Sequence, residues 1–123
     1  MKGLVERFWN FLPAFFCGMV IYLLSTSGSI QLPKTFISPD KVGHFVAYAV
    51  LTFLVLVGFS KEGQVTRPKI IWTILLCTLY GVLLEIIQYT FYPDRYFEVE
   101  DAVANFVGTG GGYLLFRSLY KFE

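Results

Sequence analysis

Four long apolar segments dominate this chain of 123 residues and limit what it can fold into. They cover residues 8–24, 42–59, 70–91 and 102–120. A helix that crosses the hydrocarbon core of a bilayer needs about 20 mainly apolar residues, within a range of roughly 17–25. Each segment has such a length, so the sequence predicts an all-α polytopic membrane protein with four transmembrane helices.

The composition argues against the soluble alternatives. Only 15% of the residues are charged and 55% are hydrophobic, whereas an average soluble domain has roughly 25% charged residues. A small soluble domain leaves about 30–40% of its unfolded surface exposed and needs polar side chains to cover it. The chain therefore fits neither a soluble enzyme nor a disordered tail. Its net charge of +1 gives no reason to expect a nucleic-acid partner.

Short connections separate the apolar segments and contain every proline except Pro13. Short connections make successive helices antiparallel neighbours. We therefore expect one domain, residues 1–123, folded as an antiparallel four-helix bundle. The first segment has a basic flank like that of a signal peptide, but its apolar stretch is longer than the usual 7–15 residues. We expect this segment to remain as an uncleaved anchor.

The two cysteines, Cys17 and Cys77, both lie inside apolar segments. Neither belongs to a CxxC motif or to a Cys/His cluster with zinc spacing. Since the chain has only one histidine, we expect no metal site, and we expect no cofactor. Both thiols should pack as small apolar side chains, and a disulfide between them is the alternative.

Basic residues divide unequally between the two sides that four spans define. Cytoplasmic loops are enriched in lysine and arginine. One side carries only Lys34, Lys41 and Arg95. The side that holds both termini and the second connection carries the other seven of the ten basic residues: Lys2, Arg7, Lys61, Arg67, Lys69, Arg117 and Lys121. We therefore expect both termini to be cytoplasmic.

Polar side chains gather at the opposite, outer end of the predicted bundle. In three of the segments they recur at spacings of three and four residues, which places them one turn apart on one helical face. These stripes are Asp40, His44 and Tyr48, with Lys41 beside Asp40, in the second segment; Gly81, Glu85 and Gln88 in the third; and Asp101, Asn105, Gly108 and Gly112 in the fourth.

Each stripe also has a structural interpretation. Asp40 and Asp101 suit the N-terminal caps of helices. Gly108 and Gly112 form a GxxxG pattern, whose usual role is close helix packing. Tyr48 suits an aromatic position at the membrane interface as well as a binding site.

Glu85 carries the strongest functional signal. An acidic side chain at the middle of a membrane helix costs about 2.5–3.5 kcal/mol on insertion scales, and such acids normally face a partner or a water-filled cavity. With antiparallel neighbours, His44 lies at about the same depth as Glu85. The sequence therefore predicts a ligand-binding or catalytic site at this end, with a purely structural ion-pair network as the alternative.

Together the three stripes resemble the VanZ-like family. The second segment reads DKxxHFxxY over residues 40–48, and the third reads GxxxExxQ over residues 81–88. The third block of the family pattern consists of Arg95, Asp101, Asn105, Gly108 and Gly112. One departure is the stretch 89–94, which is longer than in the founding member and affects the alignment of Arg95.

The resemblance implies a small bacterial protein of the cell envelope, located in the cytoplasmic (inner) membrane. The founding member is associated with resistance to the glycopeptide antibiotic teicoplanin, and it does not act by remodelling the peptidoglycan termini. No reaction mechanism follows from the resemblance.

Three functions are consistent with an outward-facing polar site. The leading one is binding of a lipid or lipid-linked cell-wall precursor through its head group. The alternative is a membrane-embedded hydrolase or transferase acting on a lipid head group, with His44 and Glu85 or Asp101 as acid–base groups. Lipid transport or scrambling is disfavoured because the cytoplasmic half of the spans lacks matching polar groups.

Membrane lipids are the expected partners, and exposed aromatic residues on every span also suit a homodimer. The residues expected to bind the ligand are Asp40, Lys41, His44, Tyr48, Glu85, Gln88, Arg95, Asp101 and Asn105.

Overall fold

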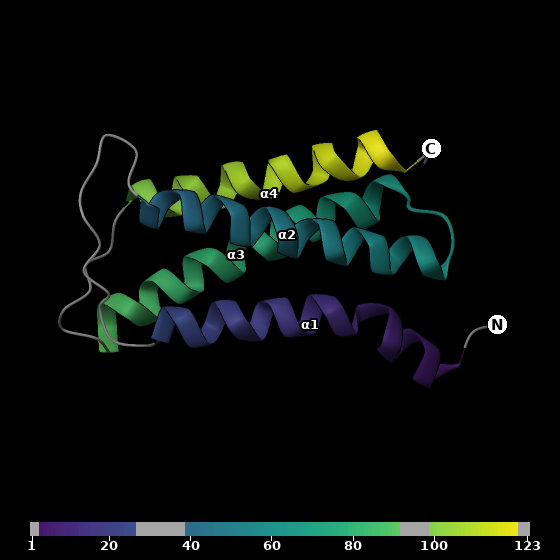
Figure 1. The fold of residues 1–123 in the computed structure, drawn as a ribbon, viewed down its shortest axis with the longest axis horizontal. Coiled ribbons are helices and arrows are strands. Elements are labelled where there is room, and N and C mark those ends of the chain that lie inside the picture. Colours follow the sequence, from purple (N-terminus) through teal and green to yellow (C-terminus); the bar gives the residue numbers. More distant parts are fainter. Residues whose placement is uncertain (1–2, 27–38, 92–98, 121–123) are drawn as a thin grey trace.

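The computed structural model describes residues 3–26, 39–91 and 99–120, with the side chains of all of these except residues 24–26 and 39–41. The described part contains four α-helices and no strand: α1 (Leu4–Thr26), α2 (Pro39–Glu62), α3 (Arg67–Phe91) and α4 (Val99–Leu119). Figure 1 shows that successive helices run in opposite directions. The predicted all-α fold with four antiparallel helices is confirmed.

Each helix begins three or four residues before its apolar segment, because residues that flank the segment form its first turn. α2 begins at Pro39 and α4 begins at Val99, each three residues before the corresponding apolar segment. Asp40 is therefore the second residue of α2 and Asp101 the third of α4. The N-cap interpretation of these two aspartates is corrected in this respect, since both lie inside the first helical turn.

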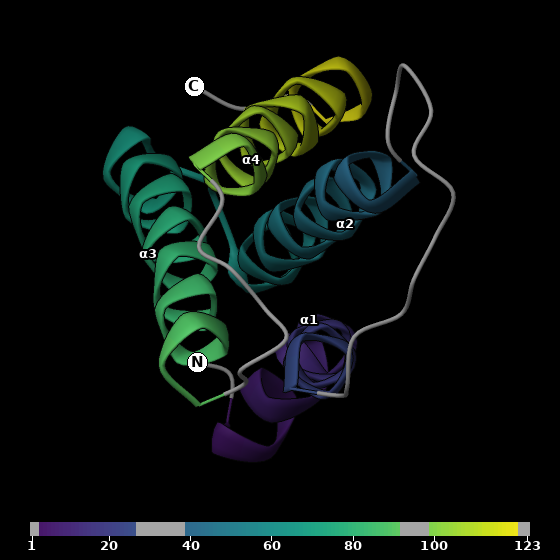
Figure 2. The same cartoon turned by 90° about the vertical axis from the view of Figure 1, so that its left-hand side faces the viewer.

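Helix α2 lies at the centre of the bundle. It packs against all three other helices and most extensively against α4, whereas α1 contacts α2 and α3 only (Figure 2). α2 and α4 run in the same direction, so their N-terminal ends meet the C-terminal ends of α1 and α3 at one end of the bundle (Figure 1). We call this the His44 end. Leu4 and Leu119 both lie at the opposite end.

Two glycines allow α4 to approach α2 closely. A Cβ atom at Gly108 would collide with the carbonyl oxygen of Phe45, and a Cβ atom at Gly112 would collide with that of Ala49. Small residues at helix crossings in membranes let two backbones meet in this way. The packing interpretation of the GxxxG pattern is therefore confirmed, and this contact fixes which side chains of α2 and α4 face each other.

The buried apolar side chains form two clusters along the bundle. One contains Ile21, Tyr48, Leu51, Cys77 and Leu84, with Cys17 packed against it. The other contains Leu56, Val65, Ile70 and Phe116. Both cysteines are free thiols. They pack as small apolar side chains, as predicted, and the alternative of a disulfide between them is wrong.

The helices differ in how well they suit a membrane. By length and hydropathy, α1, α2 and α3 qualify as membrane spans within the described part of the chain. α4 has 21 residues, which corresponds to about 31 Å at 1.5 Å per residue. Its hydropathy is lower because glycines, Asn105 and Thr109 take the places of large apolar side chains. These small and polar residues are the ones that α4 presents to its neighbours.

Candidate functional site

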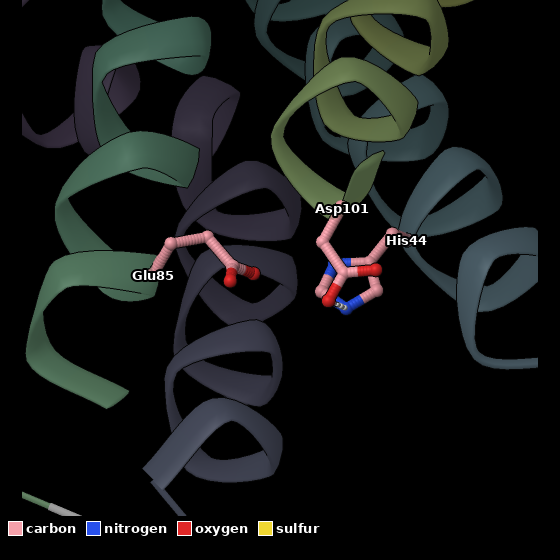
Figure 3. A group of neighbouring side chains, drawn as sticks. All are labelled: His44, Glu85 and Asp101. Carbon is pink, nitrogen blue, oxygen red and sulfur yellow. Dashed lines mark ion pairs between the residues drawn. The ribbon is translucent and has the colours of Figure 1, made fainter. Parts of the chain in front are cut away.

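Three helices bring ionisable side chains together at the His44 end. His44 comes from α2, Glu85 from α3 and Asp101 from α4, and the carboxyl group of Glu85 points toward the other two side chains (Figure 3). One nitrogen or oxygen atom from each residue lies within 4.8 Å of the other two. We call these three residues the polar triad. The sequence paired His44 with either acid, whereas the structure places all three together.

The imidazole of His44 is held from two sides. Its Nδ1 lies 2.9 Å from Oδ1 of Asn105, within hydrogen-bond distance. A carboxamide oxygen only accepts hydrogen bonds, so with this orientation Nδ1 donates and carries the proton. The other ring nitrogen, Nε2, lies 3.9 Å from Oδ2 of Asp101. This separation suits an ion pair with a protonated ring and is too long for a direct hydrogen bond.

The two acids of the triad are buried and its histidine is partly buried. Glu85 is 2% exposed and Asp101 is 6% exposed, and the side chain of His44 is 15% exposed. Acidic side chains are almost never buried to this extent unless they are paired or bind a cation. The fold therefore concentrates negative charge at a point that requires compensation by positive charge or by hydrogen-bond donors.

Asn105 forms the base of the site, one turn below Asp101 on α4. Its side chain packs against Gly81, where an added Cβ would lie 2.9 Å from Nδ2 of Asn105 and 3.2 Å from Cε1 of Tyr48. Gly81 therefore makes room for both side chains. Asn105 is 2% exposed, and its Nδ2 has no hydrogen-bond partner among the described residues.

Tyr48 and Gln88, on the same helices as His44 and Glu85, are both buried. Tyr48 belongs to the apolar core, with its ring centroid 6.4 Å from that of Tyr80. The alternative that Tyr48 sits at the membrane interface is therefore wrong, because the close packing of α2 on α3 encloses it. Gln88 lies three residues beyond Glu85 on α3, near the His44 end.

Three residues of the predicted site are not placed by the structure. Arg95 lies outside the described residues. Asp40 and Lys41 belong to the first turn of α2, but their side chains lie outside the described part of the chain.

An apolar groove between α1, α2 and α3 is a feature that sequence reasoning missed. It has a volume of about 590 Å³, and its lining includes Phe15, Met19, Leu51, Trp72 and Tyr80. Phe15, Met19 and Trp72 are exposed, so the groove opens on the apolar outer surface of the helices. No sequence signal marks it, because a groove wall and a lipid-facing surface use the same apolar residue types.

Tyr80 connects this groove to the packing around the triad. Its hydroxyl donates a hydrogen bond of 2.6 Å to the carbonyl oxygen of Gly18 and so joins α3 to α1. Its ring neighbours Tyr48, which in turn packs on Gly81 beside Asn105. Tyr48 therefore neighbours both a lining residue of the groove and the glycine on which Asn105 packs.

Comparison with known proteins bears on the family. No curated protein and no solved structure matches the chain significantly. The family model described as VanZ/LLP1 matches residues 5–120. This range includes nearly all of the four helices, the whole polar triad and Asn105, and it confirms the resemblance based on the three blocks of motif residues. The chain belongs to the VanZ-like (VanZ/LLP1) family.

Proposed function

We propose that this membrane protein binds the head group of a lipid or lipid-linked precursor of the cell envelope at the polar triad and Asn105. One observation carries the proposal: four polar side chains from α2, α3 and α4, three of them buried and His44 partly buried, converge among helices whose outer surfaces are apolar. Family membership supports an envelope role and motivates a link to resistance against teicoplanin-type glycopeptides.

The chemistry of the site favours a head group rich in hydrogen-bond donors. The carboxyl groups of Glu85 and Asp101 accept hydrogen bonds from hydroxyl or ammonium groups. The buried Nδ2 of Asn105 supplies a donor for an oxygen of the ligand. A zwitterionic or sugar-bearing head group offers both kinds of partner, whereas a simple anion meets two acids.

The apolar groove supports a lipid as the ligand. Its volume of about 590 Å³ lies within the usual range of roughly 300–1,000 Å³ for ligand sites. Its walls are apolar and it opens on the surface that faces the bilayer, so an acyl chain is its natural occupant. Tyr48 neighbours both Tyr80, which lines the groove, and Gly81 beside Asn105, which suits one lipid molecule with its head group near the triad.

Native mass spectrometry of the purified protein tests this proposal. We expect wild type to carry a reproducible bound lipid. The amount of lipid bound per Glu85→Gln molecule should be at least 10-fold lower, because the carboxylate becomes a neutral amide. Glu100→Gln is the matched control: it makes the same chemical change at an exposed position of α4, one residue from Asp101. We expect it to retain the lipid.

Equal lipid occupancy in wild type and Glu85→Gln would contradict head-group binding at the triad. Lower accumulation of Glu85→Gln in the membrane, with unchanged lipid per molecule, would instead indicate a structural ion-pair network.

A second candidate function is hydrolysis or group transfer on the bound head group. The observation that favours it is the orientation of His44, with Nδ1 on Asn105 and Nε2 toward Asp101, an arrangement that suits general acid–base catalysis. The same mass spectra distinguish the two functions. A chemically altered lipid that accumulates with wild type, and not with His44→Gln, favours catalysis.

A further inference from the structure

The polar triad contains the donor types that bind divalent transition metals. Imidazole nitrogen suits zinc and iron, carboxylate oxygen suits manganese and magnesium, and sites that mix the two bind Zn²⁺ or Mn²⁺. Catalytic zinc sites commonly use three protein ligands and leave a further position open. We infer that His44, Glu85 and Asp101 form a binding site for one divalent ion of this Zn²⁺/Mn²⁺ class.

The distances fit such a site. Atoms that bind one zinc ion at about 2.0–2.2 Å lie about 3–4 Å from one another. Nε2 of His44 is already 3.9 Å from Oδ2 of Asp101, and the ligand atoms of the triad all lie within 4.8 Å of one another. A small rotation of the carboxyl group of Glu85 brings the third ligand into place.

The surroundings of His44 fit as well. A histidine that binds a metal almost always donates its other ring N–H to an oxygen, which fixes the tautomer and the orientation of the ring. Here Nδ1 donates to Oδ1 of Asn105 at 2.9 Å. The nitrogen directed toward Asp101 is consequently Nε2, which carries the lone pair that a metal requires when the ring is neutral.

The burial of the two acids also fits a bound cation. Glu85 and Asp101 are 2% and 6% exposed, and acidic side chains buried to this extent pair with other groups or coordinate metals. The open position of such an ion would bind an oxygen of water or of a head group.

Asn105 provides an independent indication of a ligand above the base of the site. Its side chain is 2% exposed, and Nδ2 lacks a hydrogen-bond partner among the described residues. A buried N–H group without an acceptor is unfavourable by about 1–3 kcal/mol. An oxygen bound to the ion supplies such an acceptor.

The sequence contains no cluster of cysteines and histidines with zinc spacing, and for that reason it predicts no metal site. The ligands proposed here come from three helices, and the two carboxylates are brought to the histidine by the fold. The ion site does not depend on lipid binding, so each proposal fails or holds separately.

Calorimetric titration of chelator-treated protein in detergent, with Zn²⁺ or Mn²⁺ alone and no added lipid, tests the inference. We expect one ion per chain. Glu85→Gln and Asp101→Asn should each weaken binding at least 10-fold, and Asn105→Ala should weaken it about 10-fold through loss of the support for His44. Glu100→Gln should bind as wild type does.

Absence of saturable binding to wild type at millimolar metal would overturn the inference, whatever the variants do. Equal binding by wild type and Asp101→Asn would also overturn it and would identify an adventitious surface site. Zn²⁺ should in addition shift the ¹⁵N resonance of Nε2 in the single histidine, which no structural ion pair can reproduce.

Discussion

Asn105 supports the imidazole of His44 through a hydrogen bond. The 2.9 Å contact between Nδ1 and the carboxamide oxygen determines which nitrogen faces the acids. Asn105 itself is held by the packing of its side chain on Gly81, and its backbone carbonyl accepts a 2.9 Å hydrogen bond from the hydroxyl of Thr109. The position of a single ring nitrogen thus depends on residues of α2, α3 and α4.

Loss of the Asn105 side chain should therefore change the ratio of the two neutral tautomers of His44. Since His44 is the only histidine, ¹⁵N NMR of histidine-labelled, metal-free protein reports on it alone. We expect neutral His44 to carry its proton mainly on Nδ1. Asn105→Ala removes a hydrogen bond with a net contribution of about 1 kcal/mol, so the ratio of the two tautomers should fall about fivefold.

Thr109→Val is the control for that measurement, because it removes the neighbouring hydrogen bond to the backbone of Asn105 and leaves the carboxamide in place. An identical tautomer ratio in wild type and Asn105→Ala would show that Asn105 does not orient the ring.

Helix α4 approaches α2 along a stripe of small residues. Gly108 and Gly112 face the backbone of α2, whereas a Cβ atom at Gly110 would have no neighbour within 4 Å. The three glycines lie within two turns of one helix and differ in what they contact. Substitutions at Gly108 and Gly110 can therefore distinguish the packing role of a glycine from its effect on the stability of the helix.

Gly108→Ala and Gly110→Ala test the packing directly. Alanine favours a helix by about 1 kcal/mol relative to glycine, so Gly110→Ala should leave the stability unchanged or raise it. Gly108→Ala should lower the free energy of unfolding by about 1–3 kcal/mol, because the new methyl group forces α4 away from Phe45. Denaturant unfolding in detergent micelles measures both. Equal stability of the two variants would exclude a close contact at Gly108.

The four helices could be predicted because the length of an apolar segment is a local property of the chain. The nearness of His44 and Glu85 could also be predicted. In antiparallel neighbouring helices, residues at the same depth in the membrane lie side by side. The position of Asp101 relative to this pair could not. It depends on which turn of α4 meets which turn of α2, and that register arises from contacts of Gly108 and Gly112 with backbone atoms of Phe45 and Ala49.

The bundle as a whole has two chemically different ends. The triad, Asn105 and Gln88 lie toward the His44 end, where α1 and α3 finish (Figure 1). At the other end, Arg7 and Glu62 approach to 3.9 Å and Lys69 lies over the ring of Phe59, 5.5 Å from its centroid. A partly exposed ion pair of this kind contributes little stability, but the excess of basic residues there predicts the orientation of the molecule in the membrane.

Reporter fusions test this orientation. We expect alkaline phosphatase fused to the C-terminus or after Gln64 to be inactive, because the excess of basic residues predicts a cytoplasmic location for that end of the bundle. The same enzyme fused after Phe91, where α3 ends, should be active. Activity of the C-terminal fusion would reverse the predicted topology and would place the polar triad at the cytoplasmic surface.

The fit of α4 to α2 has a consequence for biosynthesis. α4 leaves the ribosome after α1, α2 and α3, and the residues that shape it for close packing also make it the least apolar of these four helices. A nascent helix enters the membrane readily when its own side chains are apolar, so α4 relies on α2 being in place to receive it. Asp101 therefore joins His44 and Glu85 only after the other three helices have been made, and a chain that stops before Val99 lacks one wall of its site.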